Sequence, residues 1–97
     1  MAQASALQHV DNERVRVTEW RFGIGDNTGW HRHEFDYVIT PVTGASVELI
    51  DAEGARSQAE MVPGQSYFRA AGVEHDVINL GPGPLVFVET ELKEPPK

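Results

Sequence analysis

The chain contains a series of short segments in which apolar and polar residues alternate, as they do on a strand with one buried face. The clearest is RVRVTEWRF over residues 14–22. Further strands are predicted over residues 30–40, 45–52, 56–62, 66–70, 76–80 and 84–92, with a hairpin turn at Glu53-Gly54. Glycine and proline separate these segments, and none has a helical period. The pattern predicts an all-β protein, either a sandwich or a small barrel.

The length of 97 residues leaves room for a single domain, which we expect over residues 13–92. Residues 1–12 are mostly small or polar. We expect them to form an N-terminal arm that is either flexible or an edge strand reaching a neighbouring subunit. His9 in this arm is expected to be solvated. The tail KEPPK, residues 93–97, is predicted to be disordered.

The last predicted strand is apolar on both faces. Leu85 and Phe87 lie on one face, and Val86 and Val88 lie on the other. Only one of these faces can fill the interior of a single chain. We therefore expect a homodimer in which a second copy covers the other face, and a locally thick core is the alternative.

Composition excludes several classes of function. The formal net charge of -7 argues against a nucleic-acid partner, because phosphate binding requires clustered lysine and arginine. The chain has no cysteine, so disulfides and thiolate metal sites are excluded. Its first residues lack the pattern of a secretory signal, and no apolar run approaches the length of a membrane span. We therefore expect a cytoplasmic protein without a membrane partner.

Histidines supply the candidate chemistry. His31 and His33 alternate with Arg32, so on a strand both imidazoles face the same side of the sheet. His75 lies in a second glycine-containing stretch. Three neutral imidazoles that converge on one point form a site for a divalent transition metal such as Fe, Zn, Ni or Mn. Three surface histidines on polar strands are the alternative.

These two stretches resemble the two sequence motifs of the cupin superfamily. The first motif has the order Gly, five residues, His-x-His, three or four residues, Glu, six residues and Gly, and the second has Gly, five residues, Pro-x-Gly, two residues, His, three residues and Asn. The matching residues are Gly25, His31, His33 and Gly44 in the first motif and Gly64, Gly72, His75 and Asn79 in the second. The resemblance implies a cupin jelly-roll β-barrel in which His31, His33 and His75 bind a metal ion.

The chain departs from the cupin pattern at two positions. Ala70 replaces the proline of the second motif, and Tyr37 replaces the glutamate that would be a metal ligand. Glu34 and Asp36 have the wrong parity for a regular strand, although a bulge could turn Asp36 inward. Three neutral imidazoles alone would leave a divalent ion its full charge, so such a centre should attract anionic oxygen donors.

Tyr37 has three interpretations. It is a donor that orients water or substrate, a phenolate ligand, or an aromatic packing residue. Phe35, Phe87 and Val77 share the inward parity and are expected to line a ligand pocket, although core packing explains them equally well. Asn79 is expected to tie its strand to a neighbouring loop.

The resemblance also implies a function. Three-histidine cupins include dioxygenases of thiols and diketones, and small single-domain cupins associated with β-alanine degradation have a comparable HRH-acid-aromatic-Asp-Tyr run. These similarities imply a metal-dependent enzyme, with an iron-dependent oxygenase as the leading case, acting on a small anionic organic molecule. The alternatives are a non-catalytic metal- or ligand-binding cupin that serves as a sensor or accessory protein, and a barrel whose histidines no longer hold metal.

Overall fold

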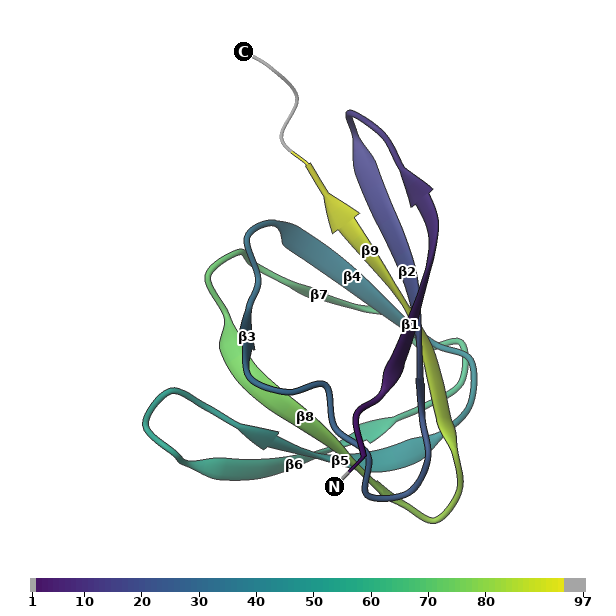
Figure 1. Cartoon of the computed structure of the whole chain (residues 1–97), viewed down its shortest axis with the longest axis vertical. Coiled ribbons are helices and arrows are strands. Elements are labelled where there is room, and N and C mark those ends of the chain that lie inside the picture. Colours follow the sequence, from purple (N-terminus) through teal and green to yellow (C-terminus); the bar gives the residue numbers. More distant parts are fainter. Residues whose placement is uncertain (1, 94–97) are drawn as a thin grey trace.

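Two facing β-sheets make up the computed structural model of the protein, which describes residues 2–93 (Figure 1). The strands are β1 (Ser5–Asp11), β2 (Val15–Phe22), β3 (His31–Arg32), β4 (Asp36–Pro41), β5 (Ala45–Ile50), β6 (Arg56–Met61), β7 (Tyr67–Arg69), β8 (Glu74–Gly81) and β9 (Leu85–Leu92). The described residues contain no helix, so none that could cross a membrane. The all-β prediction is confirmed.

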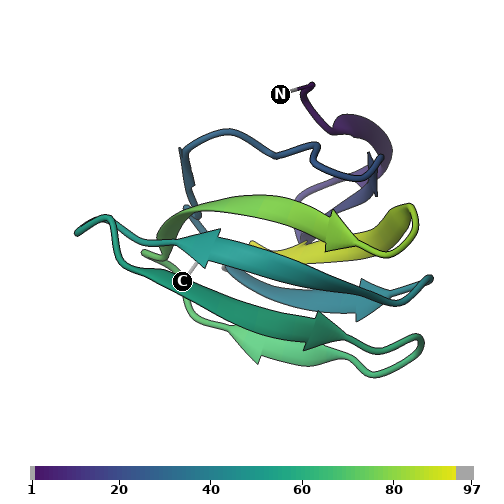
Figure 2. The ribbon, with the colours of Figure 1, turned by 90° about the horizontal axis from the view of Figure 1, so that it is seen from below.

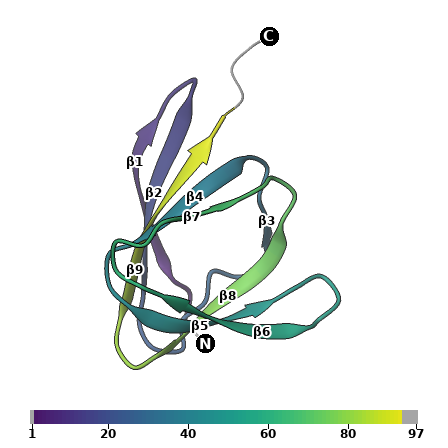
Figure 3. The same cartoon turned by 180° about the vertical axis from the view of Figure 1, so that it is seen from behind.

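One sheet has the strand order β1-β2-β9-β4-β7 and the other has the order β3-β8-β5-β6. Seen from below, the strands of the two sheets form two layers (Figure 2). The view from behind shows β7 beside β4 and, in the opposite sheet, β8 beside β5 (Figure 3). Across residues 2–93 the two sheets are not hydrogen-bonded into one closed cylinder, so the predicted barrel takes the form of two packed sheets.

The prediction of one continuous strand over residues 30–40 is wrong. His31 and Arg32 pair with β8 in one sheet, whereas β4 pairs with β9 and β7 in the other. Residues 33–35 connect the two sheets. The backbone N–H of His33 donates to the carbonyl of Val73 at 2.8 Å, and the N–H of Gly72 donates to the carbonyl of His33 at 2.8 Å. The chain therefore changes sheet in the middle of the predicted strand, and the parity of β3 does not carry over to β4.

The N-terminal segment forms an edge strand, but it pairs within its own chain and not with a neighbouring subunit as expected. β1 pairs antiparallel with β2 of the same chain, from Ser5 opposite Arg21 to Asp11 opposite Arg16. His9 is exposed, and its Nε2 lies 3.0 Å from Glu19. At the other end, Lys93 is bonded to the backbone of Arg14, and the rest of the predicted tail lies outside the described residues.

The core lies between the two sheets and is closed by aromatic residues. Leu85 and Phe87 of β9 face inward, as predicted, and the Phe87 ring packs 5.4 Å from the ring of Phe22. Asn79 of β8 is fully buried, and its amide donates to the carbonyls of Gly23 and Gly83. Its predicted role, tying β8 to neighbouring loops, is confirmed. One of these loops leads to β3 and therefore positions the histidines.

Candidate metal centre

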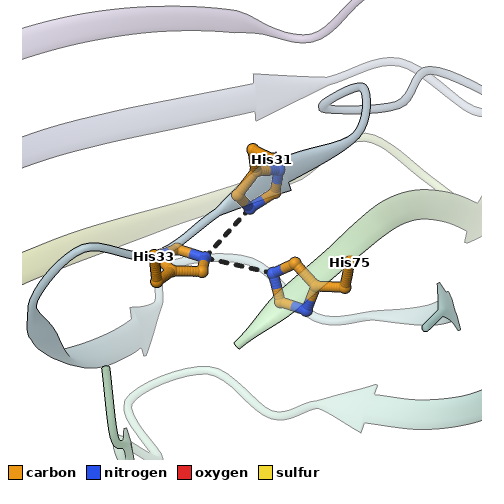
Figure 4. A group of neighbouring side chains, drawn as sticks. All are labelled: His31, His33 and His75. Atoms are coloured by element: carbon orange, nitrogen blue, oxygen red, sulfur yellow. Dashed lines mark hydrogen bonds between the residues drawn. The ribbon is translucent and has the colours of Figure 1, made fainter. Parts of the chain in front are cut away.

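Three histidines, His31, His33 and His75, meet between the two sheets and are called the histidine cluster here (Figure 4). His31 on β3 lies directly opposite His75 on β8 in an antiparallel pair. Residues directly opposite each other in such a pair have side chains on the same face of the sheet, so the two imidazoles meet. His33 joins them from the connection that follows β3. The predicted convergence of the three histidines is therefore present.

Two of the three pairs of ring nitrogens in the cluster have the spacing of metal ligands. Nε2 of His33 lies 2.9 Å from Nε2 of His31 and 3.1 Å from Nε2 of His75, and the ligand atoms all lie within 4.8 Å of one another. Ligand nitrogens that share one ion at its usual bond lengths are about 2.9–3.4 Å apart. A single proton on Nε2 of His33 can satisfy only one of its two contacts. A shared cation satisfies both, so the donor set fits a divalent transition metal.

The loop before β3 fixes the ring of His31. Its Nδ1 lies 2.9 Å from the carbonyl oxygen of Gly29 and 3.3 Å from Oγ1 of Thr28. A carbonyl only accepts, so Nδ1 carries the proton and Nε2 keeps its lone pair for the centre of the cluster. Asp76 holds this loop in place by accepting the N–H of Gly29 at 3.1 Å. The loop thus selects the tautomer that a metal requires.

Two of the histidines are held in the neutral form. Burial, with the nearby charges of His31 and His75, lowers the pKa of His33 to about 3. Burial is the largest cause that lowers the pKa of His75 to about 4, and the charge of His31 is the second. Asp76 has the opposite effect on this pKa. Both imidazoles are therefore unprotonated at neutral pH. This is the state in which histidine binds metals.

Tyr37, at the position of the cupin glutamate, stacks on the cluster. Its ring lies 3.8 Å from the ring of His33, centroid to centroid, at an interplanar angle of 15°. Burial raises the pKa of Tyr37, and the nearby Tyr67 and Glu89 raise it further. The phenol therefore stays protonated at neutral pH. Asp36 is exposed and accepts the N–H of Ala71 at 2.8 Å, so the bulge that would turn it inward is not formed.

Glu89 of β9 is a buried carboxyl that the sequence reasoning missed. Its Oε1 lies 3.8 Å from Nδ1 of His33. Burial, followed by the negative charge of Glu91, raises its pKa to about 7, against smaller opposing effects of Trp20 and Arg16. The Trp20 N–H does not reach hydrogen-bond geometry with a partner among residues 2–93. The inward position of Glu89 could have been predicted from the sequence, because Leu85 and Phe87 lie on the same face of this strand.

An apolar cavity of about 270 Å³ lies beside the cluster on the side of His75 and is called the apolar cavity here. Tyr37, Phe87 and Val77 line it, as expected from their parity. Phe35 does not line it. The change of sheet places Phe35 in a surface hollow with Leu92, where the guanidinium of Arg16 lies 5.7 Å from its ring centroid. The expectation that Phe35 contributes to the pocket is therefore wrong.

Comparisons with known proteins agree with this fold. No family model matches the chain. The chain is 54% identical over 91 residues to the β-alanine degradation protein BauB of Pseudomonas aeruginosa, a match that covers 94% of this chain and 95% of BauB. It is 47% identical to a cupin domain from Bordetella pertussis Tohama I, whose crystal structure superposes with a TM-score of 0.91 over 96% of each chain. The chain belongs to the cupin superfamily.

More distant cupins share the fold alone. An RmlC-like cupin with a double-stranded β-helix fold from Methanocaldococcus jannaschii is 13% identical and has a TM-score of 0.77, with 96% of this chain and 83% of that chain covered. The architecture thus persists where little of the sequence does.

A second opening reaches the histidine cluster of this cupin from the opposite side. His31, His33 and Glu89 line a polar groove of about 480 Å³ between β2, β9 and the connection after β3. Arg16 also lines this groove, but Glu91 accepts two of its N–H groups at 2.7 Å each. The cluster is therefore bordered by the apolar cavity and by a polar groove whose Arg16 is already paired with Glu91.

Proposed function

We propose that this cupin is a metal-dependent enzyme that binds one divalent transition-metal ion through His31, His33 and His75 and acts on a small organic acid in β-alanine degradation. The observation that carries the proposal is the convergence of three Nε2 atoms, with neighbouring atoms 2.9 and 3.1 Å apart. The similarity to BauB, which is named a β-alanine degradation protein, supports the metabolic placement.

The donor set favours particular chemistry. Iron, zinc, nickel and manganese all accept imidazole ligands, and we propose iron because dioxygenases occur among three-histidine cupins. A bound ion would supply Lewis acidity and, as iron, the capacity for oxygen chemistry. The chain supplies the rest. Neutral imidazoles preserve the full charge of the ion, and the apolar walls beside His75 exclude water and hold the carbon chain of the substrate.

Metal analysis and oxygen consumption test this proposal. Untagged protein, reconstituted separately with Fe(II), Zn, Ni and Mn, is analysed for bound metal, and dioxygen uptake is followed with β-alanine and other short carboxylic acids. We expect one ion per chain, lost in His31→Ala and His75→Ala and retained in His9→Ala, whose ring lies on β1 beside Glu19. Oxygen uptake should require iron and an acid. A protein that binds none of the four metals would refute the enzyme and the metal site together.

We also propose that two copies pair through the outer face of the five-stranded sheet. One row of residues crosses all five strands on this face and is mostly apolar; it comprises Val10, Val17, Thr90, Val38 and Phe68. Phe68 is 54% exposed and Val10 is 40% exposed. Val86 and Val88 lie on the same face and are half-buried. A contiguous apolar row on an outer face supports the homodimer.

A further inference from the structure

Arg69 is an arginine at the apolar cavity that the metal-centre proposal leaves unused. It lies on β7 directly opposite Tyr37 of β4, so both side chains project from the inner face of the sheet. Its guanidinium carbon lies 4.6 Å from the centroid of the Tyr67 ring, and one N–H donates to the carbonyl of Phe68 at 3.0 Å. The stacked ring fixes the plane of the guanidinium at the mouth of the cavity.

The charge of Arg69 has no acidic partner among residues 2–93 within ion-pair distance, in contrast to Arg16. Its remaining N–H groups are free for a ligand. Glu60 also lies at the rim of the cavity, but its carboxylate accepts a hydrogen bond from Ser46, its partner on β5. A planar guanidinium with unpaired donors matches the planar carboxylate group.

The cavity continues from Arg69 to the histidine cluster. Most of its other walls are apolar and include Ile39, Leu49 and Phe87. His75 lines the same cavity, and Arg69 is close enough that its charge lowers the pKa of His75. A molecule in this space would therefore contact the Arg69 cation, apolar side chains and His75 of the cluster.

We infer that Arg69, positioned by Tyr67, binds the carboxylate of a short-chain organic acid whose carbon chain lies in the apolar cavity and whose far end faces His75. This inference rests on the proposed function, since it assigns the residue that binds the carboxylate of the organic acid at the same site. It also accounts for binding in a protein whose net charge of -7 otherwise repels anions.

Binding of butanoate to the metal-free protein tests this site without enzyme activity. Backbone amide shifts are followed by two-dimensional NMR during titration with butanoate and with butyramide, its uncharged isostere, for the wild type, Arg69→Gln and Arg14→Gln. Arg14 is exposed before β2, so this control makes the same change in net charge. We expect saturable shifts around β7 and Val77 with butanoate. Its affinity should fall about tenfold or more in Arg69→Gln and stay within twofold of wild type in Arg14→Gln.

Several results would overturn the carboxylate site. They are an absence of saturable shifts with butanoate, equal binding of butyramide, and unchanged butanoate affinity in a folded Arg69→Gln variant. The metal assay and the butanoate assay can give opposite results, so they test the two proposals independently. Butanoate binding that depends on Arg69 in a protein that takes up no metal would preserve the carboxylate site and remove the enzyme. If the protein binds one metal ion per chain but its butanoate affinity does not depend on Arg69, the metal site stands and the carboxylate site is refuted.

Discussion

The carboxylate of Glu89 lies 3.8 Å from Nδ1 of His33, on the far side of the imidazole from the nitrogen that meets His31 and His75. Glu89 comes from the five-stranded sheet, whereas His31 and His75 belong to the four-stranded sheet. The contact therefore joins the two layers at the cluster. At this distance a carboxylate acts on the imidazole through its negative charge, which increases the basicity of the ring.

Replacing Glu89 by glutamine should weaken metal binding without abolishing it. The amide keeps the size of the side chain but removes the negative charge behind His33, and changes of this kind lower affinity about 10–100-fold. Competition with a chelator measures the dissociation constant. Glu53→Gln, in the exposed β5–β6 turn, is the matched control and should retain wild-type affinity. Equal affinities of the wild type and Glu89→Gln would contradict this role.

The stability of the metal-free protein should depend on pH through Glu89. Its pKa is raised from 4.5 to about 7 in the folded state, so the folded protein binds more protons than the unfolded chain between these values. The free energy of unfolding contributed by this group therefore falls as pH rises through that window. Glu89→Gln should match wild type at pH 4 and exceed its stability by about 2–3 kcal/mol above pH 7.

Urea unfolding at a series of pH values, with a chelator present, measures this difference. His33 and His75 titrate in both proteins, so their contributions cancel in the comparison. If the free energies of unfolding of the wild type and Glu89→Gln change in parallel with pH, Glu89 is not the group that causes the pH dependence.

Substitutions at Tyr37 should separate the role of its ring from that of its hydroxyl. The hydroxyl makes no hydrogen bond within residues 2–93, and the ring stacks on His33. Tyr37→Phe keeps the stack, so we expect metal affinity within about threefold of wild type, whereas Tyr37→Leu should lower it about tenfold. Loss of metal in Tyr37→Phe would instead identify the phenol as a ligand.

Removal of the Asn79 amide should destabilise the whole fold. The side chain is fully buried, and Asn79→Ala leaves the carbonyls of Gly23 and Gly83 and the N–H of Gly81 without their partner. We expect a loss of about 2–4 kcal/mol in the free energy of unfolding. Gln58→Ala, on the exposed side of β6, should change it by less than about 0.5 kcal/mol. Similar losses in both variants would contradict the buried role of Asn79.

The dimer proposed here should depend on the outer row of the five-stranded sheet. Phe68→Glu introduces a charge into this row, at a side chain that is 54% exposed, so the monomer can accommodate it. Light scattering coupled to size-exclusion chromatography should show a dimer for the wild type and a monomer for this variant. Val62→Glu, at a residue that is 45% exposed after β6, should remain dimeric. A wild type that is monomeric at high concentration would refute the interface.

The sequence allowed the fold and the three histidines to be predicted, but not the full surroundings of the cluster. Alternation located β2, β5 and β9, because each stays within one sheet and keeps one face largely buried. β6 is mostly exposed and was located as the return strand after the predicted turn at Glu53-Gly54. It failed at Phe35, where the chain changes sheet and the alternation starts again. Local parity could place Glu89 on the inward face of its strand. It could not show that Glu89 lies beside His33 or that Arg69 lines the same cavity as His75, since both depend on how distant strands are paired.

β3 is too short to hold its segment of the chain firmly to β8. Only two residue pairs, His31 with His75 and Arg32 with Glu74, hold this strand to β8. A shared ion bound as we propose would fasten the same two segments more strongly than this short ladder does. Release of the ion would then loosen residues 30–32 first, because the preceding loop has its own hydrogen bonds to β8, from Gly25 to Asn79 and from Thr28 to Val77.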